Sequence, residues 1–258
     1  MIEPNIQQHK QFKILLIGDE CIDEYQYGTV DRISPEAPVP VFKLGRHEVR
    51  PGMAGNVKEN LKALGLTVDA VLGSAGVKTR LIDSRSRQHI VRIDQDQPVS
   101  PVDLSAIDFD QYHAVVVSDY DKGAVTYQAV ENIVKVYKGP IFVDTKKHDL
   151  SRFNGCIVKI NELEYNARTS INDNLIVTLG DRGAVWRRHS DEQFFRARSV
   201  EIADVCGAGD TFLAALVYEY LQSNNIPQAI RFAISAAAVT VTHIGVHAPK
   251  IEEIRCHS

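Results

Sequence analysis

The chain has 258 residues, 44% hydrophobic and 24% charged, which is typical of a globular protein with a sizeable core. The formal net charge of -4 gives no electrostatic reason to expect nucleic acid or an anionic membrane as a partner. No stretch is apolar for long enough to cross a bilayer, and residues 1–10 are polar, so we expect a cytoplasmic protein without a secretory signal. The spacing of Cys21, Cys156, Cys206 and Cys256 matches neither a disulfide framework nor a zinc site, which predicts reduced thiols.

Short apolar runs alternate with helical patterns along the chain. The helical spacing of Val57, Leu61 and Leu64 stops at Gly65, and a second helical pattern over 130–137 stops at Gly139. The apolar runs are nearly continuous in Val, Ile and Leu, as in strands covered on both faces. They are Phe12–Ile17, Val68–Leu72, Ala114–Val117, Ile141–Val143, Ile157–Ile160 and Leu175–Leu179. This alternation predicts an α/β fold with a mostly parallel sheet.

Two stretches depart from this rhythm. Residues 25–50 and 86–93 alternate polar with apolar side chains, which is typical of exposed antiparallel strands. We expect them to form a small sheet over one edge of the main body. Residues 94–111 are acidic, contain two prolines and are predicted to be a surface linker.

Polar residues follow most of the predicted strands. A single acid after a strand is commonly a turn residue or a helix cap. Ligands of open parallel sheets, however, bind beyond the carboxyl ends of the strands, so a whole set of polar ends predicts a binding site. The set comprises Asp19, Asp23, Ser118, Asp119, Asp144, Thr145, Asn161, Glu164 and Thr178. Such a rim suits a hydroxylated small molecule.

The stretch ADVCGAGDTF, residues 203–212, places two glycines and an acid directly ahead of a predicted helix. Gly207 and Gly209 permit close approach of a ligand, and the free N–H groups of a first helical turn bind anions. A carboxylate at Asp210 beside a transferring phosphoryl group is placed to accept the proton of an attacking hydroxyl. The alternative is a tight turn whose Asp210 only caps the helix. These residues alone leave both interpretations open.

GAGDTF, preceded by Asp204, resembles the signature of the ribokinase-like, or PfkB, carbohydrate kinases. The segment GDECIDEYQYGTVDRISPEAPVPVFKLGRHEVRPGMAGNVKENLKALG is similar to the kinase domain of the D-glycero-β-D-manno-heptose 7-phosphate kinases of ADP-heptose biosynthesis. So are IVRID at 90–94, SDYDKGA at 118–124 and VTLGDRG at 177–183. The resemblance implies a three-layer α/β/α sandwich with a mostly parallel sheet. It also implies a small β-sheet lid from about 25–50 and 80–93, and a single kinase domain over 1–258.

The resemblance also implies roles for particular residues. Asp210 corresponds to the general base, and the amides of Gly207, Ala208 and Gly209 to the groups that stabilise the transferring phosphoryl group. Asn161 and Glu164 match an element that organises Mg²⁺, with Glu164 acting through water, and Thr178, Gly180 and Gly183 match positions along ATP. The substrate positions are Asp23, Gly52 and Asn56 for sugar hydroxyls, with Arg92 and Lys122 for a substrate phosphate. Some members bind a monovalent cation near the position of Asp204, and many form homodimers through the lid.

The chain departs from the family pattern in several places. Met53 stands where a second glycine is usual, and only SAGVKT separates Gly73 from Arg80, where relatives insert a helix and a strand. Relatives have a helix between Glu164 and Ile176, where only the segment YNARTSINDNL remains here. Three hypotheses therefore stay open: an ATP-dependent kinase for a heptose 7-phosphate or similar sugar phosphate, a kinase for an unphosphorylated sugar or a nucleoside, and a non-catalytic relative that binds a nucleotide or sugar.

Overall fold

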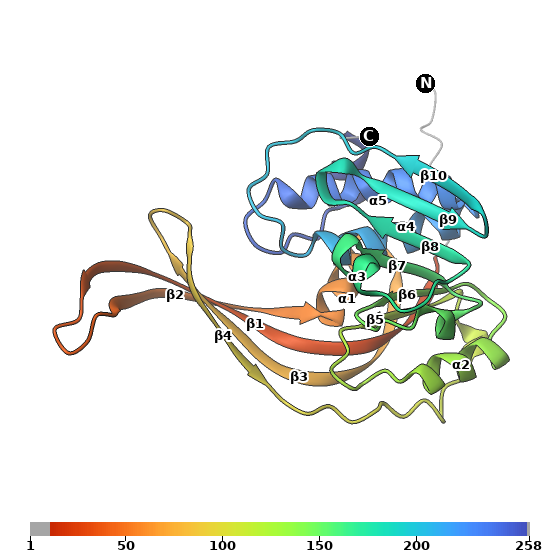
Figure 1. Cartoon of the computed structure of the whole chain (residues 1–258), viewed down its shortest axis with the longest axis horizontal. Helices are drawn as coiled ribbons and strands as arrows, with labels where there is room; N and C mark the ends of the chain where they lie inside the picture. Colours follow the sequence, from red (N-terminus) through yellow and green to blue (C-terminus); the bar gives the residue numbers. More distant parts are fainter. Residues whose placement is uncertain (1–10, 257–258) are drawn as a thin grey trace, which may run out of the picture.

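The computed structural model describes residues 11–256; the polar segment 1–10, for which we expect no secretory signal, lies outside these residues. A ten-stranded sheet runs through the molecule in the order β10-β9-β8-β7-β6-β5-β1-β3-β4, with β2 paired to β1 (Figure 1). Its strands are β1 (Lys13–Ile33), β2 (Pro40–Met53), β3 (Thr67–Asp83), β4 (His89–Asp96), β5 (Ala114–Asp119), β6 (Ile141–Thr145), β7 (Ile157–Asn161), β8 (Asn174–Thr178), β9 (Ala184–Arg188) and β10 (Asp191–Phe195). The strands from β3 through β1, β5, β6 and β7 to β8 are parallel neighbours, as the apolar runs predict.

Helices cover both faces of the parallel part of the sheet. They are α1 (Ala54–Ala63), α2 (Tyr127–Val136), α3 (Glu162–Ala167), α4 (Ala208–Ser223), α5 (Ile226–Val241) and α6 (Ile251–Cys256). Ile14 and Leu16 pack into a core with α1, α4 and α5, whereas Leu15 and Ile17 pack into a second core with α2. Successive side chains of a strand point to opposite faces, so one continuous apolar run supplies both cores. The three layers follow directly from that pattern.

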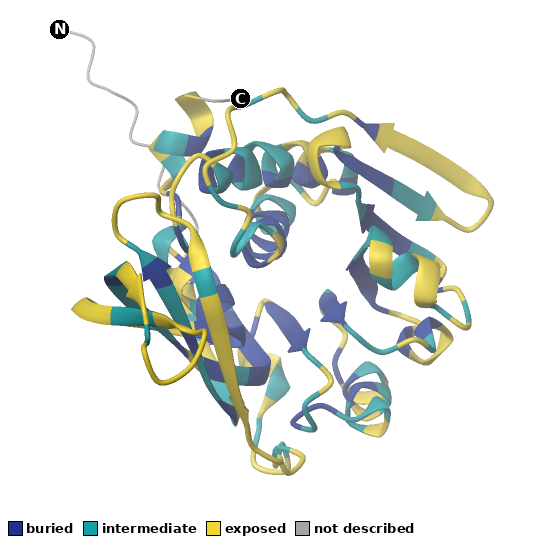
Figure 2. Cartoon of the chain, turned by 60° about the vertical axis from the view of Figure 1, so that its left-hand side comes forward, coloured by how far each residue is buried: buried dark blue, intermediate teal, exposed yellow. Residues whose placement is uncertain are grey.

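Two long strands carry the sheet out of the body and into a lid. The first half of β1 lies between β5 and β3, and beyond Gly18 the strand continues between β2 and β3. The lid is therefore a continuation of the main sheet through β1 and β3 rather than a separate small sheet, and β4 extends it to Asp96, past the predicted limit of 93. Figure 2 shows that the lid is exposed over much of its surface, in contrast to the buried strands and helices of the body.

The segment 97–108 forms the expected irregular connection back to β5. In the described residues, all four cysteines are free thiols. No helix in residues 11–256 is both long and apolar enough to cross a membrane.

Candidate active site

The residues predicted for phosphoryl transfer meet at the start of α4. Gly207 caps this helix in the left-handed region, with φ of 78°, and a Cβ at Gly207 would lie 2.9 Å from Nδ2 of Asn56. In the described chain the amides of Gly207 and Gly209 have no hydrogen-bond acceptor, whereas the Ala208 amide donates to Val205 O at 3.3 Å. Two unpaired amides at the positive end of a helix make a site for an anion.

Asp210 lies in the first turn of α4 and is buried, with 7% of its surface exposed. One carboxylate oxygen accepts a hydrogen bond from Nδ2 of Asn56 at 2.7 Å, and the other accepts one from the hydroxyl of Tyr120 at 2.8 Å. Burial raises the pKa of Asp210 to about 6, although both hydrogen bonds act to lower it. A carboxyl group that titrates in this range is suited to accept a proton near neutral pH.

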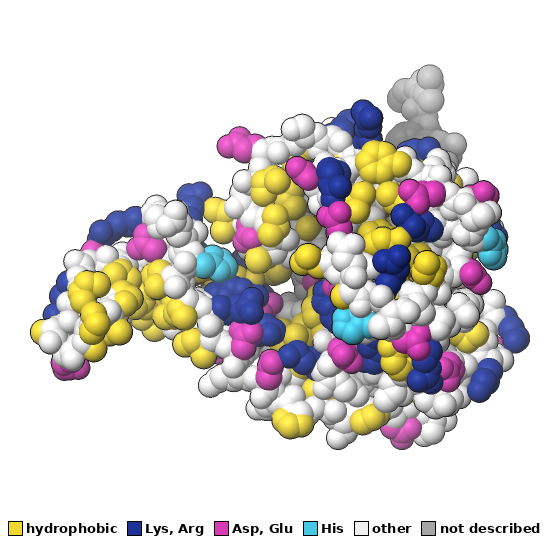
Figure 3. All heavy atoms as spheres, in the orientation of Figure 1, with side chains coloured by type: hydrophobic (Ala, Val, Ile, Leu, Met, Phe, Trp, Pro, Cys, Tyr) yellow, Lys and Arg dark blue, Asp and Glu magenta, His cyan; other side chains and the backbone are white. Residues whose placement is uncertain are grey.

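A pocket of about 430 Å³ opens beside Asp210 between the lid and the body. Of the predicted substrate residues, Asp23, Asn56, Arg92 and Lys122 line it, and Gly52 packs against Asp23 in the β1–β2 pairing. Met53 also lines it and has a φ of 54°, a region that favours glycine. The lining contains five cationic side chains, namely Lys78, Arg80, Arg92, Lys122 and Lys146. Figure 3 shows Lys and Arg side chains gathered where the lid meets the body.

All five of these cations are paired with acids: Arg80 with Asp23, Lys122 with Asp96, Lys78 and Arg92 with Asp94, and Lys146 with Glu164. Nη1 of Arg80 lies 2.5 Å from Oδ1 of Asp23, and both side chains are nearly buried. Nζ of Lys122 lies 2.6 Å from Oδ2 of Asp96. Asp23 is thus already paired with a cation, which the sequence analysis did not predict.

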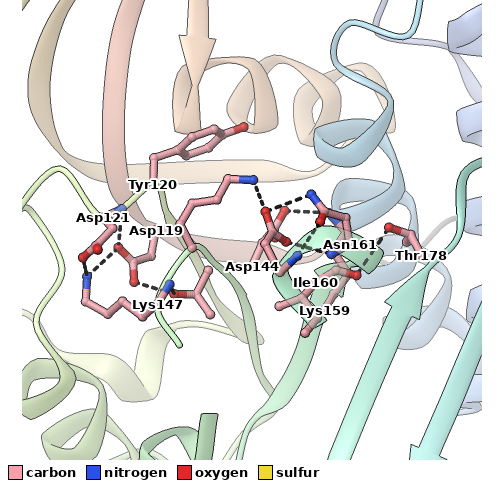
Figure 4. Close-up of polar contacts among 12 residues, drawn as sticks. Asp119, Tyr120, Asp121, Asp144, Lys147, Lys159, Ile160, Asn161 and Thr178 are labelled. Carbon is pink, nitrogen blue, oxygen red and sulfur yellow. Dashed lines mark hydrogen bonds and ion pairs between the residues drawn. The ribbon is translucent and has the colours of Figure 1, made fainter. Parts of the chain in front are cut away.

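Asn161 and Glu164 meet at the start of α3. The Asn161 side chain accepts from the Glu164 amide at 2.9 Å and the Asn161 amide donates to Glu164 at 2.7 Å, which forms a capping box (Figure 4). Lys146 also pairs with Glu164. Nearby Asp144 is buried, and burial raises its pKa while the charge of Glu164 acts in the same direction. These oxygen ligands suit Mg²⁺, which keeps several of its waters and binds through one or two carboxylates.

The residues predicted to lie along the nucleotide differ in how closely the rest of the protein surrounds them. Thr178 ends β8 and donates its hydroxyl to the Ile160 carbonyl at 3.3 Å (Figure 4). Gly180 faces open space, since a Cβ there would meet nothing within 4 Å. A Cβ at Gly183 would instead collide with the backbone of residues 195–197, so packing alone accounts for that glycine. Asp204 accepts from the amides of Cys206 and Gly245 at 3.0 and 2.9 Å, which ties the helix start to the segment after α5.

Sequence reasoning missed a buried lysine that lies beside the site. Lys159 lies within buried β7, 2.7 Å from Asp144, and its Nζ would lie 3.1 Å from a Cβ at Gly209 (Figure 4). A lysine in an otherwise apolar strand was the available signal, because a buried amine needs a partner. Asp19, one of the predicted rim residues, accepts from the amides of Tyr120, Lys122 and Ala124 and so fixes the loop that presents Tyr120.

A larger cavity of about 750 Å³ lies apart from these residues, between α5, α6 and the segment after β10. Arg196, Arg198, Arg231 and Arg255 line it. It contains none of the predicted site residues.

A family model described as pfkB family carbohydrate kinase matches residues 112–253. A curated relative, the bifunctional protein HldE of Nitratiruptor sp., is 33% identical over 300 residues, with 94% of this chain and 64% of the relative covered. The chain thus spans less than two thirds of the length of the curated relatives it matches.

Among solved structures, ribokinase of Thermotoga maritima matches with a TM-score of 0.73 at 17% identity, with 95% of this chain and 99% of that chain covered. Ribokinase of Arabidopsis thaliana, complexed with ribose and ATP, matches with a TM-score of 0.72 at 14% identity, with 96% and 98% covered. These likenesses confirm the predicted ribokinase-like α/β fold.

Proposed function

This chain belongs to the pfkB family of carbohydrate kinases, and from that membership we propose that it transfers the γ-phosphoryl group of ATP to a hydroxyl of a phosphorylated sugar, a heptose 7-phosphate or a close analogue. The sugar hydroxyl oxygen bonds to the γ-phosphorus, its proton passes to Asp210, and the bond from the γ-phosphorus to the β,γ-bridging oxygen breaks to release ADP.

The anion-binding groups at the start of α4 support the location of the transfer. The unpaired amides of Gly207 and Gly209 would bind the γ-phosphoryl group, and the buried ammonium of Lys159 adds a positive charge beside Gly209. Donors fixed before the reaction stabilise charge that develops in the transition state. Mg²⁺, held through water by Asn161 and Glu164, would offset the charge of the ATP phosphates. Gly180, open to solvent, leaves room for the nucleotide beside β8.

The single observation that favours a phosphorylated sugar is the pairing of Arg80 with Arg92 across β3 and β4. Like charges directly opposite each other destabilise a sheet. The pocket adds Lys78 from the same strand and Lys122 from the facing loop, so several cations converge on one space. These four cations are paired with only three acids, Asp23, Asp94 and Asp96, so a dianionic phosphate placed there would offset the remaining positive charge and accept charge-assisted hydrogen bonds.

The first experiment measures ADP release from ATP and Mg²⁺ with a panel of free sugars, nucleosides and sugar phosphates. We expect turnover with a heptose 7-phosphate or another sugar phosphate and its loss in Asp210→Asn, which keeps the shape of the side chain. Lys122→Ala should raise KM for that substrate about tenfold or more, since a hydrogen bond between charged groups contributes about 1.5–3 kcal/mol. Lys62→Ala, which removes an exposed lysine on α1, is the matched control.

Other outcomes of the panel would contradict the proposal. Turnover only with free sugars or nucleosides, unaffected by Lys122→Ala, would assign the second substrate class. ATP binding without turnover on any member of the panel would identify a non-catalytic relative.

We also propose a homodimer formed through the lid. Large apolar side chains are exposed along its strands, among them Ile33, Leu44, Val49, Val91 and Ile93. An exposed, apolar, extended sheet favours association with a second copy. Light scattering should give twice the mass of one chain, and Leu44→Glu should reduce it to the monomer mass; a monomeric parent protein would refute the proposal.

A further inference from the structure

Three side chains with metal-binding atoms gather where α5 ends and α6 begins. They are His243, His247 and Glu253, and their ligand atoms all lie within 4.8 Å of one another. His243 is exposed, and the other two are partly buried. None of the three belongs to the kinase site described above.

The hydrogen bonds around His243 prepare it as a ligand. Its Nδ1 lies 3.0 Å from the carbonyl oxygen of Val239, which places the ring hydrogen on Nδ1 and leaves the lone pair on Nε2. A histidine that binds a metal ion through one ring nitrogen usually donates the other N–H to a carbonyl or carboxylate. His243 therefore already has the tautomer of a ligand.

The spacing of the other two groups matches a small divalent ion. Nε2 of His247 lies 3.3 Å from Oε1 of Glu253, and the second oxygen of Glu253 accepts from the Lys250 amide at 2.7 Å. With zinc–nitrogen bonds of about 2.0–2.1 Å, two ligands of a tetrahedral zinc ion lie about 3.3 Å apart. The backbone hydrogen bond orients the carboxylate while Oε1 faces the imidazole.

The two imidazoles lie against each other without an intervening group. Their ring centroids are 3.8 Å apart and their planes differ by 12°. A shared ion requires the rings to tilt toward each other, and His243, being exposed, has room to rotate.

We propose that His243, His247 and Glu253 bind one Zn²⁺ ion, with water in the remaining coordination position. Nitrogen and carboxylate ligands in this number are typical of zinc and are softer than the all-oxygen sets that Mg²⁺ prefers. The ion would join the end of α5 to the start of α6.

The segment that this ion would fix contacts the kinase site. The His247 carbonyl accepts from Thr240 at 3.2 Å, and the Val246 carbonyl accepts from Arg50 of β2 at 2.7 Å. A Cβ at Gly207 would lie 3.1 Å from Cγ1 of Val246, and Gly245 donates to Asp204. Zinc would therefore stabilise the segment that supports the start of α4.

The test uses the full chain, stripped with a chelator and then titrated with Zn²⁺ by calorimetry, and with Co²⁺ by visible absorption. We expect one Zn²⁺ per chain with micromolar or tighter affinity, the intense absorption of four-coordinate Co²⁺, and a rise in the thermal midpoint on zinc addition. His247→Ala and, separately, the shape-preserving Glu253→Gln should each weaken zinc binding about tenfold or more. His148→Ala, which removes an exposed histidine on the loop after β6, should bind as the parent does.

Three results would overturn the proposal: no zinc binding at micromolar concentration, binding unchanged in both ligand variants, or loss of binding in His148→Ala. The first would leave an ordinary hydrogen bond between His247 and Glu253. Because every measurement is a binding or stability measurement, the result is independent of whether the protein phosphorylates a sugar.

Discussion

The hydrogen bond from Tyr120 to Asp210 allows a direct test of the proposed base. The hydroxyl lies 2.8 Å from Oδ1 and, with Asn56, opposes the burial that raises the pKa of Asp210 to about 6. Tyr120→Phe removes a donor to a buried charge, an interaction of about 1.5–3 kcal/mol. Since one pKa unit corresponds to 1.36 kcal/mol, the pKa of Asp210 should rise by about one to two units, to about 7–8.

The acidic limb of kcat/KM reports the pKa of this base in the free enzyme. The parent protein should lose activity tenfold per pH unit below about 6, because only the ionised carboxylate accepts the proton. In Tyr120→Phe the same loss should begin at about pH 7–8, with much of the activity restored at pH 9. ADP release between pH 5 and 9 measures both profiles.

The matched control is Tyr218→Phe, since the Tyr218 hydroxyl is buried without a hydrogen-bond partner. Its pH profile should coincide with that of the parent. An acidic limb that stays in place in Tyr120→Phe would refute the assignment of Asp210 as the titrating base, and an equal shift in Tyr218→Phe would show that the shift does not report this contact.

Three further predictions concern stability. The pKa of Asp210 is raised from 3.8 to about 6, so the native state holds this proton more tightly than the unfolded state does. The free energy of unfolding therefore falls as the pH rises from about 4 to 6. In urea, Asp210→Asn should have a free energy of unfolding about 2–3 kcal/mol higher than the parent at pH 7.5, but a similar one at pH 4. Lys159→Met leaves the buried Asp144 without its cation and should lower the free energy of unfolding by about 3–5 kcal/mol. Adding Asp144→Asn should recover most of that loss. Equal stability of the single and the double variant would contradict the role of the ion pair. Asp19→Asn weakens the hydrogen bonds to three loop amides, so it should lower the free energy of unfolding by about 1–3 kcal/mol and expose residues 120–124 to proteolysis. An unchanged cleavage pattern would show that Asp19 does not hold the loop.

The core of this fold was readable from the sequence because it rests on local pattern. The apolar run 12–17 alternates sides along one strand, and Ile14 and Leu15 accordingly enter opposite cores. The start of α4 was also predictable, since both interpretations of its two glycines place them directly ahead of the helix. The three-layer arrangement follows once such strands are parallel.

The contacts within the site depend on long-range geometry that no local pattern contains. Tyr120 and Asp210 are 90 residues apart in sequence, and their hydrogen bond exists because β5 and α4 deliver them to the same edge of the sheet. The same holds for Arg80 and Asp23, which meet only because β1 and β3 are paired far beyond the body. The sequence indicated which residues are polar at the rim, but not how they pair.

The shortened stretch after Gly73 does not remove the pocket beside Asp210. β3 runs through this stretch as one continuous strand, with an irregularity in its pairing opposite Glu20–Ile22. Gly76 within it has a φ of 108°, and a Cβ there would collide with the Gln95 carbonyl. Side chains two residues apart on a strand share a face, so Lys78 and Arg80 both enter the pocket directly from β3. Arg80 then faces Arg92 on β4 and pairs with Asp23 on β1, which places a fixed cation among the predicted sugar-binding residues. The compact strand thus brings positive charge close to the proposed acceptor, and that charge is the reason to expect an anionic sugar.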